Sequence, residues 1–254
     1  MSVISIANHK GGVGKTTTTI NLAAGMARAG YRVLLIDLDP QANASFALGL
    51  KKQDRTIFQV LAYQDDIRKM IQSVPDFDIV ASSVHLAGFE KNNEVGKEFI
   101  LQESLAAVRE LYDFILIDCP PSLGALTVSA LTASDYVIVA LQPETLAMQG
   151  MGDFIRILRT VKTRMNAPLE LLGIVITQYD SRKVLHRDVV QIAQERYGEA
   201  VMKTFIRGNI SLAESQSMGQ HIFQYDEHCN GAEDYMQLTR EVVQRLQSEL
   251  AVIE

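Results

Sequence analysis

The chain has 254 residues and a formal net charge of −6 at pH 7. That charge argues against a protein that coats nucleic acid over its whole surface, although it leaves room for a local basic patch. With 47% hydrophobic and 21% charged residues, the chain can bury a substantial core. Its two cysteines, Cys119 and Cys229, form no C-x-x-C pattern, so neither a disulfide framework nor a zinc site is expected. Cys119 is expected to be a small buried residue.

The start of the chain, "MSVISIA", lacks the basic region of a signal peptide. No apolar stretch is long enough to span a bilayer. These features predict a cytoplasmic protein.

Short apolar runs alternate with helix-like segments along the chain, which is the pattern of an α/β protein. The runs predicted to form strands are 2–7, 31–37, 78–82, 113–118, 135–141 and 169–177. Helices are expected over 16–30, 98–111 and 231–250, the first of them ending at Gly30.

Strands separated by helices imply right-handed crossovers, because parallel neighbours need long connections. We therefore expect one domain over residues 1–254, with a mostly parallel twisted sheet and helices on both faces.

A glycine-rich loop follows the first predicted strand in the sequence "NHKGGVGKTTTT". The loop is a variant of the common phosphate-binding motif, because residues 8–10 supply no opening glycine. Glycines let the backbone N–H groups approach an anion closely, and the helix that follows directs its positive end at the same place. The residues predicted to hold the nucleotide phosphates are Lys10, Gly11, Gly12, Val13, Gly14, Lys15, Thr16 and Thr17.

Within this loop, the Lys15 side chain is expected to reach the β- and γ-phosphates and the Thr16 hydroxyl to bind Mg²⁺. Thr17 is placed near the α-phosphate. The alternative is a glycine turn that merely links a strand to a helix. The Lys-Thr pair at the junction makes that alternative improbable, so we expect ATP and Mg²⁺ to bind here.

Three aspartates follow predicted strands, where the ligands of open parallel sheets gather. Asp37 and Asp39 sit at the carboxyl end of the second strand, and Asp118 ends a run of four apolar residues. A carboxylate at the position of Asp118 suits a Walker B residue that holds Mg²⁺ through water. One such aspartate alone could be a turn former or a helix cap, but three beside a phosphate loop favour a nucleotide site.

The motifs together resemble the ParA/Soj family of deviant Walker A P-loop ATPases, within the ParA/MinD superfamily. The resemblance rests on "KGGVGKTT", on "VLLIDLDPQAN" at 33–43 and on "FILIDCPPS" at 114–122. The later segments "NISLAESQS" and "GAEDYMQL" extend it over nearly the whole chain.

The resemblance implies a Mg²⁺-dependent ATPase that is monomeric with ADP and forms a homodimer with ATP. Lys10 would then be the signature lysine that reaches the phosphates of the partner subunit, although on its own it could be a solvated loop charge. Asp39 would position the attacking water, and Asp37 would support Mg²⁺ and the switch region. The resemblance also places Gln178 and the 206–209 region, including Arg207, near adenine.

Nonspecific double-stranded DNA is the surface that the ATP dimer is expected to bind. The basic residues predicted to contact phosphates are Arg182, Lys183, Arg187, Lys203 and Arg207. The chain departs from the family pattern PRNxRLSEAP, because it reads "RGNISLAESQ" at 207–216 and so lacks two expected arginines. That change removes two of the positive charges that the resemblance implies for the DNA surface.

Three uses of ATP remain open for such a protein. The first is positioning of a plasmid or chromosome on the nucleoid with a ParB-like adaptor that offers a basic N-terminal segment. A protein cargo, such as a chemoreceptor cluster or a carboxysome, would use the same chemistry. The second is MinD-type membrane binding, which the acidic closing helix disfavours because anionic lipid repels it. The third is a metabolic or metal-transfer ATPase.

Overall fold

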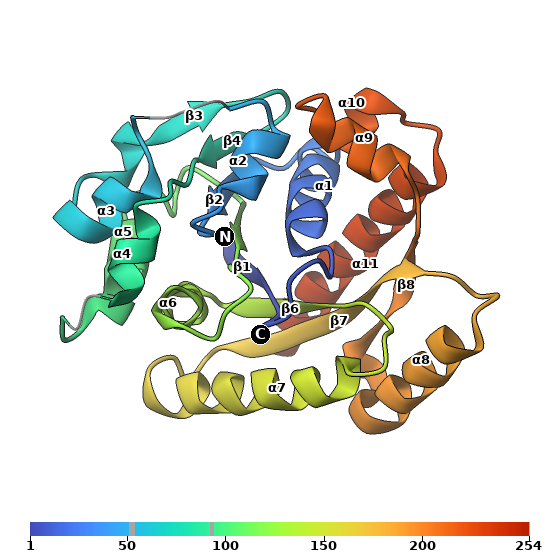
Figure 1. The fold of residues 1–254 in the computed structure, drawn as a ribbon. Coiled ribbons are helices and arrows are strands. Elements are labelled where there is room, and N and C mark those ends of the chain that lie inside the picture. Colours follow the sequence, from blue (N-terminus) through green and yellow to red (C-terminus); the bar gives the residue numbers. More distant parts are fainter. Residues whose placement is uncertain (51–53, 92–93, 254) are drawn as a thin grey trace.

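The computed structural model describes residues 1–50, 54–91 and 94–253 (Figure 1). These residues form an eight-stranded sheet in the order β3-β4-β2-β5-β1-β6-β7-β8, in which only the β3–β4 pair is antiparallel. The strands are β1 Ser2–Ala7, β2 Val33–Asp37, β3 Ile71–Ser73, β4 Asp78–Val80, β5 Phe114–Asp118, β6 Tyr136–Leu141, β7 Glu170–Tyr179 and β8 Val201–Arg207.

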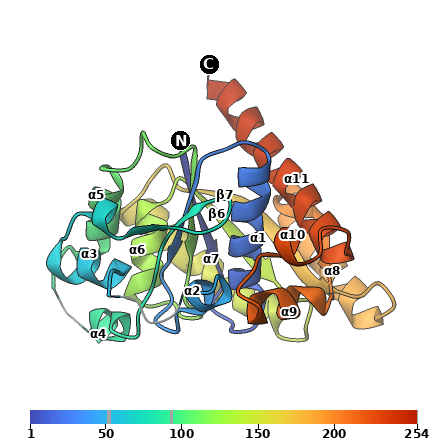
Figure 2. The same cartoon turned by 90° about the horizontal axis from the view of Figure 1, so that it is seen from above.

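Helices cover both faces of this sheet, as Figures 1 and 2 show. One face carries α1, α2 and α9–α11, and the other carries α3–α8. Their bounds are α1 Lys15–Arg28, α2 Asn43–Ala47, α3 Ile57–Tyr63, α4 Leu86–Lys91, α5 Ile100–Leu105, α6 Ala125–Ala133, α7 Ala147–Arg164, α8 Val184–Tyr197, α9 Ser211–Ser217, α10 Ile222–Tyr225 and α11 Asn230–Ile253. The described ranges also contain short 3₁₀ helices at Ile67–Lys69, Lys97–Phe99 and Gly198–Ala200.

Side chains alternate in direction along the central strands, and this alternation produces two hydrophobic cores, one on each face of the sheet. In β1, Val3 packs against the α3–α8 layer, whereas its neighbour Ile4 packs against the α1 and α11 layer. Both side chains are fully buried, because successive residues of a strand point to opposite faces. The continuous apolar runs of the sequence therefore reflect a sheet that is covered on both sides.

The predicted α/β architecture is confirmed, and most of the predicted strands lie within two residues of the observed ones. Helix α1 ends where predicted: Gly30 has a φ of 93° and its N–H bonds to the carbonyl of Ala27 at 2.9 Å. A left-handed residue at this point is the usual C-terminal stop of a helix, and glycine adopts it without strain.

Besides shifts of a few residues at element ends, several details differ from the prediction, and strand β8 was not among the predicted runs. The helix expected over 98–111 is α-helical only to Leu105, because residues 106–108 and 111 bond three residues back and wind as tighter turns. Strand β4 ends at Val80 rather than at residue 82, since Ser82 leaves the sheet and its hydroxyl donates to the carbonyl of Asp39 at 2.6 Å. Strand β3 was not predicted, because a three-residue edge strand with one apolar residue gives no periodic signal.

Candidate functional site

The predicted site residues come together at the carboxyl edge of the sheet. Strand β1 leads into the glycine loop, β2 ends in Asp37, and β5 ends in Asp118. Strand β7 brings Gln178 to the same edge, and β8 brings Arg207. Because these strands are parallel, residues that are far apart in sequence meet at the place where open α/β sheets hold their ligands.

The loop between β1 and α1 has the backbone shape of an anion cradle. Gly12 and Gly14 take φ values of 75° and 86°, a region that other residues rarely enter. A Cβ atom on Gly14 would also lie 3.5 Å from the side chain of Thr177. Helix α1 begins directly after Gly14, so its free N–H groups face the loop.

The Lys15 side chain is buried and turns back over this loop. Its Nζ donates to the carbonyl oxygen of Lys10 at 2.9 Å. Burial lowers the pKa of Lys15, and the nearby Asp118 opposes that shift. The ammonium group is therefore held where an anion in the cradle would meet it.

Thr16 and Asp118 form the part of the site where a magnesium ion is expected to bind. The Thr16 hydroxyl donates to Asp118 Oδ2 at 2.8 Å, and the Thr19 hydroxyl donates to Asp118 Oδ1 at 3.2 Å. Burial, with the charge of Asp37 added to it, raises the pKa of Asp118. A cation beside Asp118 would stabilise the ionised carboxylate and so oppose this rise in its pKa.

The donor set fits a magnesium ion that arrives with a nucleotide. In the described part of the chain, no cluster of three or more His, Cys, Asp or Glu side chains could hold a metal alone. Mg²⁺ is commonly bound by one or two protein oxygens together with substrate phosphates and water. Thr16 would supply one such oxygen directly, and Asp118 would act through water.

Asp37 is the last residue of β2 and Asp39 lies on the loop that follows, and the two carboxylates have different surroundings. Asp39 lines a cavity of about 570 Å³ that the glycine loop also lines, together with Gly12, Lys15, Thr16, Thr17 and Gln178. Burial raises the pKa of Asp39. Its carboxylate accepts a hydrogen bond from the N–H of Gln41 at 2.9 Å, which fixes its orientation.

The Asp37 carboxylate lies behind the cavity, because this residue is fully buried. It accepts from the N–H and hydroxyl of Ser45 at 2.8 and 2.7 Å and from the N–H of Asp39 at 3.2 Å. These contacts favour a role in holding the Asp39 loop and α2. The predicted support of Mg²⁺ by Asp37 stays a prediction.

Lys10 points away from the cavity of its own subunit. Its ammonium group forms an ion pair with Glu144, just before α7, and both side chains are partly exposed. Lys10 is absent from the lining of the 570 Å³ cavity, whereas Gly11, Gly12, Gly14, Lys15, Thr16 and Thr17 belong to it. The two lysines of the loop are therefore placed for different tasks.

The predicted adenine region forms a smaller cavity of about 300 Å³ beside the phosphate loop. Gln178, Arg207 and Asn209 line it together with Thr17 and Gln216. The side chain of Gln178 donates to the carbonyl of Gly12 at 2.9 Å, so it closes one wall. Gln216 donates to the Thr17 hydroxyl at 2.8 Å.

Sequence reasoning missed several partners in this site. Ser45, Glu144 and Gln216 each bond a predicted residue from more than five positions away, and no local motif identifies them.

Cys119, which was predicted to be a buried structural residue, is fully buried, and burial raises the pKa of its thiol to about 12.

The predicted DNA-binding residues do not form one cluster. Arg182, Lys183 and Arg187 are exposed around the start of α8, but Arg182 is paired with Asp180. Lys203 lies in another groove, beside Glu199 and Glu241.

Arg207 donates to the buried Asp234 through Nη2 at 2.6 Å and to Glu233 at 2.7 Å, so its charge is already neutralised within the fold. The prediction that Arg207 contacts DNA thus has weak geometric support.

Comparison with known proteins identifies the chain. A family model described as an AAA domain matches residues 1–171. The chain is 40% identical over 246 residues to the sporulation initiation inhibitor protein Soj of Bacillus subtilis, covering 94% of this chain and 97% of that protein. It is 41% identical over 242 residues to the chromosome-partitioning ATPase Soj of Treponema pallidum, covering 94% and 95%.

The fold also matches a solved structure that holds a nucleotide. Cobyrinic acid a,c-diamide synthase from Mycobacterium smegmatis, with bound ADP and magnesium, superposes with a TM-score of 0.86. The two are 34% identical, and the match covers 98% of this chain and 96% of that one. With the P-loop geometry described above, these similarities show that the chain belongs to the ParA/Soj family of P-loop ATPases.

Proposed function

We propose that ATP joins two copies of this chain in a sandwich dimer that binds DNA without sequence preference and positions a chromosome or plasmid cargo. The observation that carries the proposal is the placement of Lys10. Its side chain is partly exposed and lies outside its own phosphate cavity, so phosphates of a second subunit could compete with its partly exposed partner Glu144 for the ammonium group. A cation delivered only on dimerisation would stabilise phosphoryl charge in the way that an arginine finger does.

Within each subunit, the loop residues would perform the hydrolytic chemistry. Lys15 and the loop N–H groups would bind the β- and γ-phosphates of ATP, and Thr16 would orient the magnesium ion that accompanies them. That ion would neutralise charge on the phosphate oxygens. Asp39, which lines the cavity, would position the attacking water.

DNA binding is supported by basic residues near the start of α8. Lys183 and Arg187 are exposed there, and the Arg187 guanidinium donates to the carbonyl of Ser181 at 2.7 Å and pairs with no carboxylate among the described residues. The chromosome-partitioning names of the curated relatives agree with this role. Attachment to DNA would place the protein on the nucleoid, in the cytoplasm.

The closing helix supports the partition role over membrane attachment. Its apolar stripe packs into the core, since Tyr235, Leu238, Val242 and Leu246 are buried. A helix that inserts at a bilayer surface leaves such a stripe exposed. Of the helices the structure describes, none is both long and apolar enough to cross a membrane.

A partner protein would stimulate the slow hydrolysis. A ParB-like adaptor with a basic N-terminal segment fits this role, because added positive charge near the phosphates lowers the barrier to transfer. An adaptor on a protein cargo would use the same chemistry. Curated relatives named for chromosome partitioning are 38–41% identical to the chain, which favours a DNA cargo over the metabolic role of the 34% identical synthase.

A gel shift with random duplex DNA tests the proposal. The protein is compared in Mg-ATP, in Mg-ADP and without nucleotide, each at two salt concentrations. Binding that needs ATP and weakens with salt is the expected result. If no nucleotide state binds DNA, the DNA part of the proposal fails, and membranes and protein scaffolds become the surfaces to test.

A further inference from the structure

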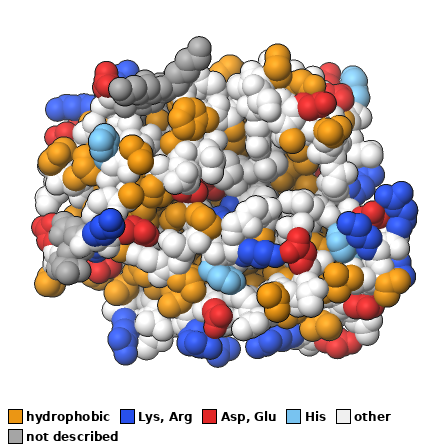
Figure 3. Space-filling model, viewed as in Figure 1, with side chains coloured by type: hydrophobic (Ala, Val, Ile, Leu, Met, Phe, Trp, Pro, Cys, Tyr) orange, Lys and Arg blue, Asp and Glu red, His pale blue; other side chains and the backbone are white. Residues whose placement is uncertain are grey.

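A groove between α7 and α8 is lined, among the residues that the structure describes, by four arginines and by no acidic side chain. It has a volume of about 560 Å³, and the arginines are Arg156, Arg159, Arg164 and Arg196. Helices α7 and α8 pack against each other on the face of the sheet opposite α1. Lys and Arg side chains also gather along the lower edge of the molecule, over α7, in Figure 3. In a chain with a net charge of −6, this concentration of positive charge is a local exception.

The arginines on α7 form a row because of their spacing. Arg156, Arg159 and Arg164 lie at positions i, i+3 and i+8, which fall on one side of an α-helix. At about 1.5 Å per residue, the row extends over about 12 Å. Thr160 and Thr163 continue the same side, and their hydroxyls donate to carbonyls of α7 itself.

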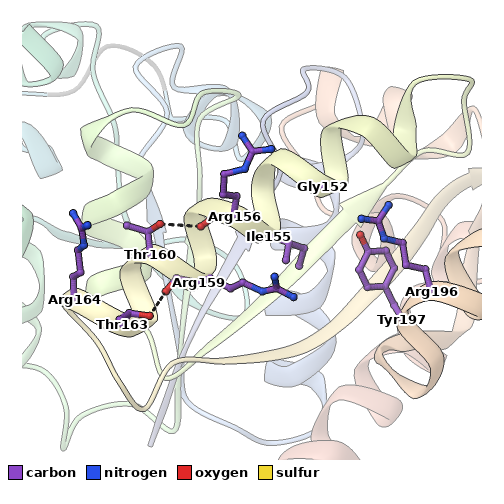
Figure 4. A pocket seen from close by; sticks show the side chains of 9 residues that line it. All are labelled: Gly152, Ile155, Arg156, Arg159, Thr160, Thr163, Arg164, Arg196 and Tyr197. Atoms are coloured by element: carbon purple, nitrogen blue, oxygen red, sulfur yellow. Dashed lines mark hydrogen bonds between the residues drawn. The ribbon is translucent and has the colours of Figure 1, made fainter.

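Helix α8 adds a fourth cation from the opposite wall. Arg196 Nη2 lies 4.0 Å from the position that a Cβ atom on Gly152 would occupy, so it reaches across to α7. Its guanidinium also stacks 5.5 Å from the centre of the Tyr197 ring, which orients it. Figure 4 shows Arg159 extending from α7 toward Tyr197 and Arg196.

Most of these charges are not neutralised by the fold. Arg156 pairs with Asp153 at 3.3 Å. Among the residues that the structure describes, no carboxylate pairs with Arg159, Arg164 or Arg196. Arg182 and Arg207, by contrast, both have carboxylate partners. The groove therefore holds cations that remain available to an outside anion.

The lining favours the phosphates of a nucleic acid over an acidic peptide. Protein-binding grooves usually supply apolar and aromatic anchors for side chains, but here Ile155 and Tyr197 are the apolar contributions to the lining. A row of guanidinium groups and hydroxyls suits a repeating anion that is bound without regard to sequence. Phosphates of one DNA strand follow each other at about 3.4 Å along the axis, so a row of about 12 Å meets about three or four of them.

We infer that this α7–α8 groove is a second contact surface for the DNA backbone, apart from the basic cluster at the start of α8. The inference rests on the proposed function, because it extends the surface on which the dimer meets DNA. All four arginines belong to one subunit, so each copy brings a complete groove, and a dimer presents two.

The test replaces three of these arginines and measures the salt dependence of DNA binding. The variant Arg159→Gln, Arg164→Gln, Arg196→Gln is compared with wild type by fluorescence anisotropy, using a random duplex in Mg-ATP over a series of salt concentrations. A control triple, Arg32→Gln, Arg68→Gln, Arg109→Gln, removes the same charge from other exposed positions. Unchanged basal ATPase activity and unchanged thermal unfolding show that both triples fold.

The slope of log affinity against log salt is negative, and its magnitude should decrease by about 3 for each groove that the duplex occupies, and only in the groove variant. Restoring charge with Arg159→Lys, Arg164→Lys, Arg196→Lys should recover most of the slope.

Equal slopes in the groove and control triples would overturn the inference while leaving the proposed function intact. Loss of binding to a polyglutamate peptide, with DNA binding retained, would overturn it in favour of an acidic protein partner. A wild-type protein that binds no DNA would instead defeat the proposed function, and the inference with it.

Discussion

Lys10 and Glu144 form an ion pair that joins the phosphate loop to the segment before α7. Because this pair holds Lys10 outside its own phosphate cavity, the two lysines of the loop can be separated by mutation. Lys15 lies over the cradle, and Lys10 lies at its edge. Loss of each lysine should therefore have a different consequence.

Replacing Lys10 with alanine should leave ATP binding by the monomer largely intact but prevent the ATP-dependent dimer. Without a cation from the partner, turnover should fall by about 10²–10³-fold. Light scattering in Mg-ATP measures the mass, and a fluorescent ATP analogue measures binding. A variant that dimerises normally on ATP would show that Lys10 is only a solvated loop charge.

Replacing Lys15 with alanine should abolish nucleotide binding in every state. The ammonium group lies over the glycine loop, where it would neutralise phosphate charge that the backbone N–H groups alone cannot balance. Lys69→Ala, at an exposed position, is the matched control. Isothermal titration with Mg-ATP gives the comparison, and tight binding by the Lys15 variant would remove this residue from the phosphate site.

Replacing Asp39 with alanine should separate dimerisation from hydrolysis. The carboxylate lines the cavity but bonds no residue of the phosphate loop, so ATP and the dimer should persist. Loss of the water-positioning group should lower turnover by about 10²–10⁴-fold. Phosphate release is measured beside dimer mass, and Asp39→Asn keeps the shape as a control. Undiminished release in both variants would exclude this role.

The strands and the glycine loop could be predicted from the sequence because both leave local signals. Continuous apolar runs mark strands that are buried on both faces, and glycines mark backbone shapes that other residues resist. Two of them, Gly12 and Gly14, indeed have positive φ values. The position of the phosphate loop therefore follows from the order of residues along the chain.

Side-chain partners across the fold leave no such signal. The bond of Asp37 to Ser45, the pairing of Lys10 with Glu144 and that of Arg207 with Asp234 arise only when distant segments meet. The assignments of Asp37 to Mg²⁺ and of Arg207 to DNA followed from the family resemblance and from residue type, which do not show these partners, and both stay predictions. The arginines of the α7–α8 groove were missed likewise, because two helices must pack before their charges form one surface.

The buried His221 is expected to reduce the stability of the fold at mildly acidic pH. Burial lowers its pKa, although Asp76, which bonds its Nε2 at 2.8 Å, acts in the opposite direction. In the unfolded chain the imidazole titrates near pH 6.5. Below that pH the unfolded state takes up a proton that the folded state resists, so stability falls as pH decreases toward the folded pKa. The slope contributed by this residue cannot exceed about 1.4 kcal/mol per pH unit.

The pH effect is measured as the melting temperature between pH 8 and pH 5.5, for wild type and His221→Gln. The glutamine keeps a donor for Asp76 but does not titrate in this range. The difference between the two proteins should be constant above pH 6.5 and should shift in favour of the variant below it. Parallel curves over the whole range would show that His221 does not carry the effect.

Arg207 should matter more for stability than for DNA. Its backbone N–H and its guanidinium both donate to Asp234, a residue that is only 4% exposed. Arg207→Gln would leave that carboxylate with fewer partners, and we expect it to cost about 1–3 kcal/mol of unfolding free energy. Urea denaturation measures this cost.

The double variant Arg207→Gln, Asp234→Asn supplies the control, because it removes the buried charge together with its partner and should recover part of the loss. The salt slope of DNA binding should stay close to the wild-type value in Arg207→Gln, since the guanidinium is already neutralised by two carboxylates. A slope lower by about 1, with stability unchanged, would instead return Arg207 to the DNA surface.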